Sequence, residues 1–499
     1  LPELLDTTAD TASWLVTATL LTGAIATPTL SRLADMHGKR RMMAVALAVS
    51  VLGSILGSFS EAVPLLIAAR ALQGVGMALI PIGIAMMRDE LPRDKVPLGV
   101  AMMSATLAIG AGIGLPTSGL ITEHLDWHAI FWVTGAVGTI LLVAALTMLP
   151  ESPVRTHGSF DFRGAVLLTI ALTAILLALS KGAQWGWGSP ETVGTTALGL
   201  VILGFWVPLE LRTPSPLVDV RVAARRAVLL VNLVSVFAGF ALFANMLLTT
   251  VLLQSPEGTG YGLGLSTFTT GVWMMPNAIA FAVMAPVSAW ITRKFGPQTT
   301  LLLGSAVTGA AYVARVFLSD NLGQIVVGSV AVGVGTAIAY GAIPTLLMRA
   351  VPVTETASAN GLNVLLRSLG TSSASATTAA VTTAMAITVG GKAFTDLPGI
   401  NLILWLAAGC SFAAALIFWG RGAYCGWLCP FGALQELTNK SLRSKGSPYR
   451  ISEISISASI PPSRCDPTPC ASVRPGRSGR GGERVRRRRD PPRGRSTRP

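Results

Sequence analysis

Long apolar runs alternate with short polar segments along most of the chain. A bilayer core about 30 Å thick needs roughly 20 consecutive apolar residues for one helix to cross it. Lipid offers no partner for backbone N–H and C=O groups, so runs of this length are predicted to be helical. We predict thirteen spans, at residues 12–30, 42–59, 62–86, 98–121, 129–149, 164–180, 193–209, 227–253, 267–290, 299–318, 321–347, 357–386 and 401–419.

The composition agrees with this pattern. Hydrophobic residues make up 51% of the chain and charged residues only 12%, whereas soluble domains carry about 25% charged residues. These values exclude an ordinary soluble domain and predict an all-α membrane protein. His124 and His128 have the i, i+4 spacing of metal ligands but lack a third ligand. We therefore predict no metal site there, and we predict that the chain is not an enzyme.

The charged residues that do fall in spans are all arginines. No predicted span contains Asp or Glu, whereas Arg70, Arg315 and Arg367 each lie in one. A charge within a span costs about 2.5–3.5 kcal/mol or more and usually has a function. We single out Arg70, with Gln73, as the partner of a titrating acid. Arg315 is expected to reach toward the outer surface, and Arg367 is expected to lie at the inner interface.

Lys and Arg collect in alternate loops. Cytoplasmic loops retain positive charge, so this asymmetry predicts the orientation. The opposite loops hold only Lys181 and Lys392, which places Leu1 outside and everything after Trp419 in the cytoplasm. The residues assigned to the cytoplasmic side are Arg32, Lys39, Arg40, Arg41, Arg88, Arg93, Lys95, Arg155, Arg163, Arg212, Arg221, Arg225, Arg226, Arg293, Lys294 and Arg349.

The loop "SRLADMHGKRR" at residues 31–41 holds more than positive charge. Gly38 permits a tight reversal between two spans. Asp35 can pair with Lys39 and Arg40, or with the positive end of a neighbouring helix. Such a contact can hold in one conformation and break in another, so we predict a conformational latch at Asp35, Gly38, Lys39 and Arg40.

Several ordered motifs resemble the fourteen-span drug:proton antiporters of the major facilitator superfamily. In that subfamily the loop between spans two and three reads G-x-L-A-D-x-x-G-R-[KR], and here Ser31 replaces the first Gly. "RALQGVGMALIP" carries Arg70 and Gln73 of the fourth-span motif. "GAGIGLPTSG" is similar to the fifth-span antiporter motif, with Pro116 one place late and Ser118 in place of a Gly. The residues matched to that motif helix are Gly110, Gly114, Pro116 and Gly119.

The resemblance implies a major facilitator fold: two helical bundles and two linker helices. It places the first bundle at residues 1–150, the linker helices and a cytoplasmic loop at 151–223 and the second bundle at 224–419. "SAWITRKFGPQ" (288–298) is a degenerate copy of residues 31–41 and supports two related bundles. "LPEL" at the start resembles the end of the subfamily's first span, so we expect the first helix to be missing and about thirteen spans to remain.

The function implied is proton-coupled efflux of small amphipathic drugs or metabolites by alternating access. The expected setting is the inner (plasma) membrane, crossed many times by a monomer with the proton as coupling ion. Candidate residues of the substrate cavity are Asn245, Trp273, Asn277 and Asn363. Because the predicted cavity has no carboxylate, neutral or monocationic substrates are expected.

The segment after Trp419 departs from this family. Residues 420–446 contain Cys425 and Cys429 in a C-x-x-x-C-P pattern, which resembles polyferredoxin-like membrane iron–sulfur proteins that accompany nitrous-oxide and nitrate reductases. A cubane cluster needs four thiolates, and Cys465 and Cys470 do not have ferredoxin spacing. We therefore predict no iron–sulfur cluster and no other cofactor, with Cys425 and Cys429 as weak candidate ligands.

Residues 447–499 are rich in Arg, Pro, Ser and Gly and cannot build a hydrophobic core. "RVRRRR" could attract nucleic acid or anionic lipid, but no specific nucleic-acid partner is predicted. A fusion or reading-frame artefact explains the change of composition better than a real domain. Two alternatives to the exporter remain open: an iron–sulfur electron-transfer membrane protein and a non-functional truncated fusion. The exporter explains some four hundred residues, whereas the iron–sulfur pattern explains about twenty.

The charge asymmetry makes the orientation testable. A reporter that is active only in the cytoplasm, fused after Trp419, should be active, because the positively charged loops hold this end of the chain inside. The matched fusion of a reporter that is active only outside should be silent. Outside activity at this position would contradict the thirteen-span topology.

Overall fold

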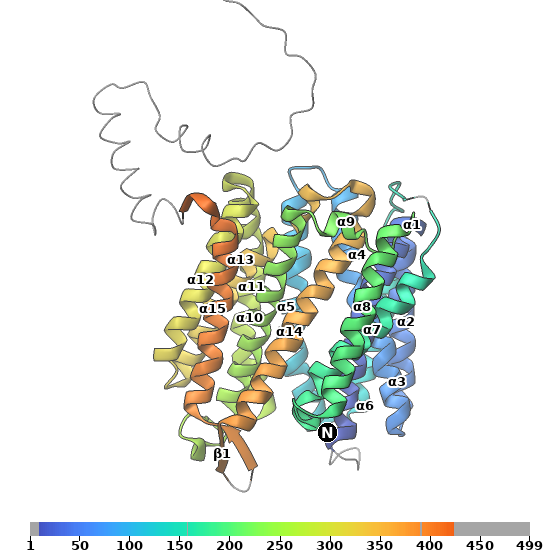
Figure 1. Cartoon of the computed structure of the whole chain (residues 1–499). Coiled ribbons are helices and arrows are strands. Elements are labelled where there is room, and N and C mark those ends of the chain that lie inside the picture. The colour runs from blue at the N-terminus through green and yellow to red at the C-terminus, as the bar shows by residue number, and fades with distance from the viewer. Residues whose placement is uncertain (1–8, 157, 390–391, 424–499) are drawn as a thin grey trace, which may run out of the picture. The chain divides into compact units, whose positions relative to one another are not determined.

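A computed structural model describes residues 9–156, 158–389 and 392–423. The chain in this part is almost entirely helical, as the apolar runs require (Figure 1). The helices of the first part of the chain are α1 (Ala9–His37), α2 (Lys39–Ser58), α3 (Val63–Gly74), the 3-10 turn η1 (Val75–Ala78), α4 (Leu79–Glu90), α5 (Val96–His124), α6 (His128–Met148), α7 (Phe162–Trp185) and α8 (Pro190–Arg212).

The second part begins with the short helix α9. Its elements are α9 (Val220–Ala223), α10 (Arg226–Gln254), η2 (Glu257–Thr259), α11 (Thr267–Phe295), α12 (Pro297–Phe317), α13 (Leu322–Ala350), η3 (Val353–Glu355), α14 (Thr356–Ala384), the strands β1 (Ala386–Val389) and β2 (Lys392–Thr395), and α15 (Leu397–Ala423). The two strands pair antiparallel, with Ala386 opposite Thr395. This hairpin joins α14 to α15 and was not predicted.

Within the described residues, each of the thirteen predicted spans corresponds to a long helical segment, with α3, η1 and α4 together forming one of them. Twelve of these segments are long and apolar enough to cross a membrane. The exception is α14, whose sequence is rich in Ser, Thr and Ala. It packs against α10 on one side and α1 on another, so much of its surface meets protein rather than lipid.

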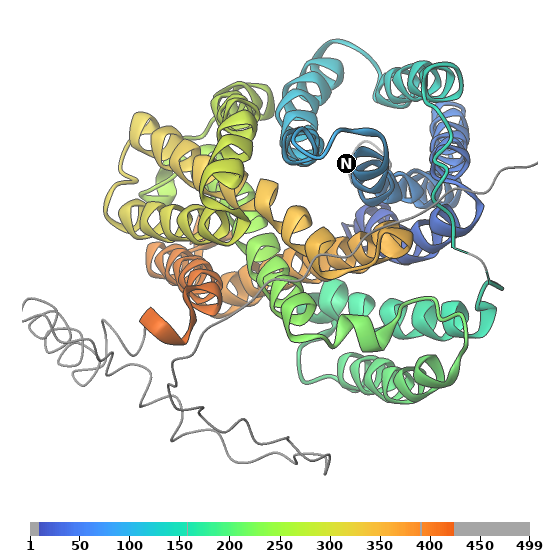
Figure 2. The ribbon, with the colours of Figure 1, turned by 90° about the horizontal axis from the view of Figure 1, so that it is seen from above.

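Most of the described helices belong to two groups: the first bundle, α1–α6, and the second bundle, α10–α15. They meet along two seams, where α5 packs along α11 and α1 packs along α14. Helices α7 and α8 pack against each other outside both bundles, and α7 contacts α1 and α14 (Figure 2). This arrangement matches the expected pair of linker helices. By their contacts, the described residues form one unit, which lies within Leu1–Tyr424.

Large apolar side chains are exposed on the outer helices, where lipid would cover them. Ile140 on α6 is 68% exposed and Phe205 on α8 is 72% exposed. The buried apolar residues instead lie where helices meet, as Phe281 and Tyr340 do between α11 and α13 in the second bundle. Hydrophobicity alone therefore cannot separate the lipid face from the protein interior, because both are apolar.

Small residues set the closest helix contacts. A Cβ added at Gly304 on α12 would lie 2.5 Å from the backbone nitrogen of Ala339 and 2.7 Å from the carbonyl oxygen of Gly335 on α13. Backbone atoms cannot move aside as a flexible side chain could. The α12–α13 contact therefore requires glycine at position 304, in the manner of small-residue interfaces between transmembrane helices.

We expect Gly304→Ala to lower the melting temperature of the purified protein, because the new methyl group forces α12 and α13 apart at a cost of about 1–3 kcal/mol. Gly204→Ala on α8 is the matched control, since a Cβ there meets nothing within 4 Å. Alanine favours helix over glycine, so Gly204→Ala should leave the melting temperature unchanged or raise it. Equal melting temperatures for the two variants would contradict this account of the α12–α13 contact.

Candidate functional site

The carboxylate of Asp35 lies at the end of α1 and caps the start of α14. Asp35 is fully buried, and its Oδ1 and Oδ2 accept hydrogen bonds from the backbone N–H groups of Ala357 (3.1 Å) and Ser358 (2.8 Å). The residue at the N-cap position of α14, Glu355, makes no capping hydrogen bond with its own side chain. A residue 322 positions earlier therefore satisfies N–H groups that a local cap would normally satisfy.

The charge environment of this junction includes a second carboxyl group. Burial raises the pKa of Glu355, and nearby Asp219 raises that pKa further, whereas Arg32 and Arg225 lower it. The positive end of the α14 helix dipole favours a negative charge at Asp35. Of the two partners considered for Asp35, the positive end of a neighbouring helix is the one that hydrogen-bonds to it.

Two further contacts bring α14 against the first bundle. Ser31 on α1 is fully buried, and a Cβ added at Gly361 on α14 would lie 2.6 Å from the Ser31 hydroxyl oxygen. The small residues at positions 31 and 361 thus allow α1 and α14 to approach closely. Arg88 on α4 donates a hydrogen bond to the hydroxyl oxygen of Thr356, at 2.7 Å.

The remaining latch residues lie at the junction of α1 and α2, where Gly38 alone separates the two helices, so most of the predicted loop at 31–41 is helical. Gly38 has φ = 112°, a conformation that favours glycine, and a Cβ there would lie 2.5 Å from a carboxylate oxygen of Glu151. Lys39 forms an ion pair with Asp89, and both side chains are fully buried. The backbone N–H of Arg40 donates to Glu151, at 3.2 Å. Lys39 is therefore paired with Asp89 on α4 and not with Asp35, its predicted partner.

Arg70 and Gln73 contact each other on α3. Nη1 of Arg70 donates to Oε1 of Gln73 at 3.0 Å, and Nε2 of Gln73 donates to the hydroxyl of Ser54 at 2.9 Å. Within the described residues, no carboxylate forms a salt bridge with Arg70. The role of Arg70 as partner of a titrating acid stays a prediction.

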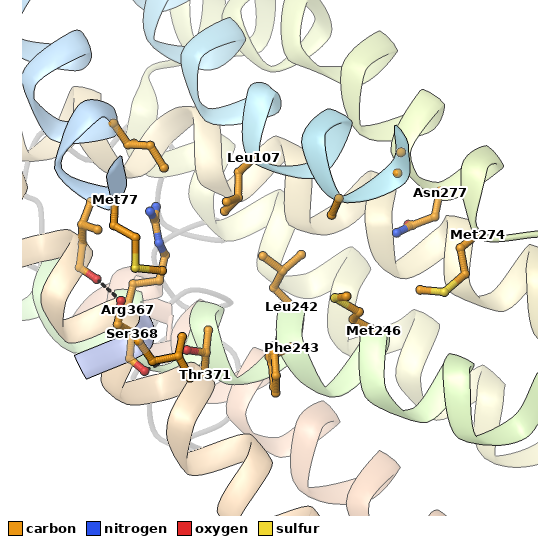
Figure 3. A pocket seen from close by; sticks show the side chains of 16 residues that line it. Met77, Leu107, Leu242, Phe243, Met246, Met274, Asn277, Arg367, Ser368 and Thr371 are labelled. Atoms are coloured by element: carbon orange, nitrogen blue, oxygen red, sulfur yellow. Dashed lines mark hydrogen bonds between the residues drawn. The ribbon is translucent and has the colours of Figure 1, made fainter. Parts of the chain in front are cut away.

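A cavity of about 280 Å³ lies between the two bundles. Helices α1, α4 and α5 with η1 supply one wall, and α10, α11 and α14 supply the other (Figure 3). Most of the surface is apolar, as in other small-molecule sites, with a few polar groups among flexible methionines. The lining residues are Leu20, Met77, Ile80, Leu107, Ala111, Gly112, Leu242, Phe243, Met246, Met274, Asn277, Ala278, Val364, Arg367, Ser368 and Thr371.

Of the four residues predicted for the cavity, the structure places Asn277 in the wall and the other three elsewhere. Asn245 accepts a hydrogen bond from the buried Arg315 and donates to the carbonyl oxygen of Ser329 at 3.3 Å. Asn363 donates to Asn232 and Ser235, at 2.9 and 2.7 Å. These amides hydrogen-bond between helices, which is a common use of polar residues in membrane bundles.

Other sequence-based predictions, about exposure and buried charge, also differ from the structure. Trp273 is 40% exposed and does not line the cavity. Arg367, expected at the inner interface, lines the cavity, and Arg315, expected to reach outward, is 1% exposed. Helices also extend beyond the predicted spans, so that Glu210 lies in α8 and is 2% exposed. Its carboxylate accepts hydrogen bonds from the backbone N–H groups of Leu217 and Val218, which satisfies the buried group.

The residues matched to the antiporter motif lie on α5, which packs along α11. A Cβ added at Gly110 or Gly114 meets nothing within 4 Å, whereas one at Gly119 lies 3.0 Å from Cα of Phe268. Gly112, which was not singled out, makes the tightest approach, because its Cβ would lie 2.0 Å from Cβ of Ala278. Pro116 lies within the helix. The α5–α11 seam thus depends on Gly112 and Gly119 more than on the other motif glycines.

Comparison with known proteins gives a family match for most of the chain. The model of the Major Facilitator Superfamily matches residues 1–375. The chain is 27% identical over 366 residues to multidrug resistance protein Stp of Mycobacterium tuberculosis (strain CDC 1551 / Oshkosh), which covers 72% of this chain and 67% of that protein. It is 28% identical over 300 residues to the tetracenomycin C resistance and export protein of Streptomyces glaucescens, covering 60% of this chain and 55% of that protein.

A solved structure has a similar fold. The human organic anion transporter MFSD10 (TETRAN) superposes with a TM-score of 0.59 and 14% identity, covering 82% of this chain and 83% of that chain. Identity this low supports the fold alone. The helix arrangement and this match confirm the predicted architecture of helical bundles.

A second family model corrects the cofactor prediction. The model of a 4Fe-4S binding domain matches residues 401–448, so the expectation that the chain has no iron–sulfur cofactor is wrong on this finding. The match begins within α15, earlier than the predicted boundary at 420. It contains Cys410, which lies half-buried in α15, and Cys425 and Cys429, which lie outside the described residues. Such a cluster transfers single electrons and usually has four thiolate ligands. Residues 401–448 contain three cysteines, one fewer than the four thiolates that such a cluster usually has.

The buried Lys39–Asp89 pair leads to a stability prediction. Lys39→Met should lower the free energy of unfolding by about 3–5 kcal/mol, because it leaves the Asp89 carboxylate buried without its cation. The double variant Lys39→Met/Asp89→Leu removes both charges and should recover much of this loss. Thermal or denaturant unfolding of the purified variants measures both effects, and a double variant less stable than Lys39→Met would contradict the assignment.

Proposed function

Because the chain belongs to the major facilitator superfamily, we propose that it is a proton-coupled exporter of small amphipathic molecules that works by alternating access. The observation that carries the proposal is the apolar cavity of about 280 Å³ between the two bundles. Such a site is large enough for part of a small organic molecule and offers few polar groups. The names of the two curated relatives, a multidrug resistance protein and a tetracenomycin C resistance and export protein, favour the same function.

Alternating access requires the two bundles to rock against each other around the cavity. Contacts between the bundles near the 31–41 loop must then break in one state. Asp35, Ser31 and Arg88 of the first bundle all contact the first turns of α14. We propose that these contacts are the latch that holds this end closed.

Helix α14 connects the latch to the substrate. The N–H groups of its first turn donate hydrogen bonds to the Asp35 carboxylate. Four residues further along the same helix line the cavity: Val364, Arg367, Ser368 and Thr371. Arg367 lies nine positions after Ser358, which is about 13.5 Å along a helix that rises about 1.5 Å per residue. A ligand that shifts α14 would therefore act on the latch through one continuous element.

Proton coupling is the finer part of the proposal. Arg70, the eighth residue of α3 and hydrogen-bonded to Gln73, is the proposed cationic partner of the coupling acid. In this scheme, protonation of the acid releases Arg70 and favours the other access state. We also propose that the protein acts as a monomer in the inner membrane, with the junction of α1 and α2 on the cytoplasmic side.

Filling the cavity tests the proposed transport site. Leu107→Trp places a larger side chain in the cavity wall and should reduce efflux of lipophilic dyes from cells at least about tenfold, because the substrate and the indole compete for the same space. Ile140→Trp, on the exposed surface of α6, is the control and should retain transport. If both variants exported dyes at the original rate, the cavity would not be the transport site.

The latch is tested by Asp35→Asn, which preserves shape and removes charge. Hydrogen bonds to a charged group contribute about 1.5–3 kcal/mol, so their weakening should shift the balance of access states about tenfold or more. Turnover in proteoliposomes with an imposed pH gradient should fall, while substrate affinity changes less. Asp320→Asn, at an exposed site between α12 and α13, should transport normally. Normal turnover of Asp35→Asn would contradict the latch.

A further inference from the structure

Arg367 is a buried cation in the wall of the central cavity. Its side chain is 9% exposed, and among the described residues none forms a salt bridge with its guanidinium. The guanidinium lies over the ring of Tyr340, whose centroid is 5.2 Å from Cζ. None of the sixteen residues that line the cavity in the described chain is Asp or Glu. The positive charge of Arg367 is therefore not neutralised within the site.

The position of Arg367 is set by close packing. A Cβ added at Gly239 on α10 would lie 2.3 Å from the carbonyl oxygen of Arg367 and 3.1 Å from its Cγ. Gly239 thus lets the backbone and stem of Arg367 rest directly on α10. Tyr340, under the guanidinium, is held by its own hydroxyl, which donates to the carbonyl oxygen of Ala238 at 3.3 Å. Three helices, α10, α13 and α14, therefore hold this cation in one place.

Nothing else in the helix offsets the charge. Arg367 is the twelfth residue of α14, too far from either end for the helix dipole to help, since that effect is confined to the terminal turns. A cation over a tyrosine ring gains some energy, but less than a paired carboxylate provides. An unpaired buried charge is expensive and is usually retained for function.

The side-chain amide of Asn277 presents a second hydrogen-bond donor to the cavity. A Cβ added at Gly333 on α13 would lie 1.9 Å from Oδ1 of Asn277, so that oxygen faces α13. In Figure 3, the side-chain nitrogen of Asn277 points toward Leu107 and Met246. Arg367 lies at the opposite end of the labelled group. Arg367 and Asn277 thus both offer N–H donors, and a ligand that complements them carries acceptors.

We propose that the cavity selects amphipathic molecules with a single anionic acceptor group, such as a carboxylate, which binds the Arg367 guanidinium while the apolar part lies against Leu107, Phe243 and Met246. This inference rests on the proposed function and narrows its substrate class. Neutral molecules remain substrates of lower affinity. The monocationic substrates expected from the sequence are disfavoured, because a cation in this cavity is repelled by Arg367 and finds no carboxylate there.

The test uses three probes that differ only in charge: 11-(dansylamino)undecanoic acid, its primary amide, and the corresponding amine. Dansyl fluorescence reports their binding to the purified full chain in an uncharged detergent at neutral pH. We expect the acid to bind about tenfold more tightly than the amide, with the amine weakest, because a charge-assisted bond to arginine is roughly twice as strong as a neutral one.

Substitutions assign the preference to the residue. Arg367→Gln should bring the affinity for the acid to that for the amide while the affinity for the amide stays within about twofold, which also shows that the variant is folded. Arg367→Lys should keep part of the preference, because lysine retains the charge without the planar fork. Arg349→Gln, which removes an exposed arginine near the end of α13, is the matched control and should behave as the original protein.

The outcomes separate this inference from the proposed function. Equal binding of the three probes, tighter binding of the amine, no binding of any probe, or an equal loss for all probes in Arg367→Gln would each overturn the proposed selectivity. If Leu107→Trp abolishes binding while no charge preference exists, the cavity is a binding site and only the selectivity fails. If Leu107→Trp leaves the binding of all three probes unchanged, the cavity is not their site and both proposals fail.

Discussion

The contact between the Asp35 carboxylate and the first turn of α14 is the interaction on which the arrangement of the two bundles depends. It satisfies two helix N–H groups that have no local cap, and it does so from a helix more than three hundred residues away in the sequence. The close approach of Ser31 to Gly361 makes it possible, because a larger residue at either position would separate α1 from α14. A buried charge is tolerated there because the N-terminus of a helix supplies partial positive charge.

Helix α14 differs from the other long helices because it faces protein on most sides. Its Ser, Thr and Ala residues make it less apolar than the other spans, yet it carries four residues of the cavity wall as well as the N–H groups bound by Asp35. The least hydrophobic span therefore carries both the N–H groups of the proposed latch and part of the cavity wall. In a bilayer, a span with few apolar residues must be shielded by other helices, and a shielded helix can contact a substrate.

The match to a 4Fe-4S binding domain concerns a different part of the chain. It overlaps the last described helix and continues past residue 423, whereas the cavity is lined by residues between Leu20 and Thr371. The proposed transport site is formed only by these cavity residues. No lining residue of the cavity falls within residues 401–448.

The apolar runs by themselves determined the thirteen helical segments, because lipid forces any exposed backbone to form its own hydrogen bonds. The local motif around Gly38 also determined a tight reversal, since that φ value favours glycine. Only the tertiary structure decided which polar side chains face the cavity. Asn245, Asn277 and Asn363 look alike in sequence, but two of them hydrogen-bond to other helices and one lines the cavity. Arg367 and Asp89 acquire their roles from neighbours on other helices, because a transmembrane helix is apolar on its lipid face and its protein face alike, and hydrophobic periodicity cannot tell the two apart.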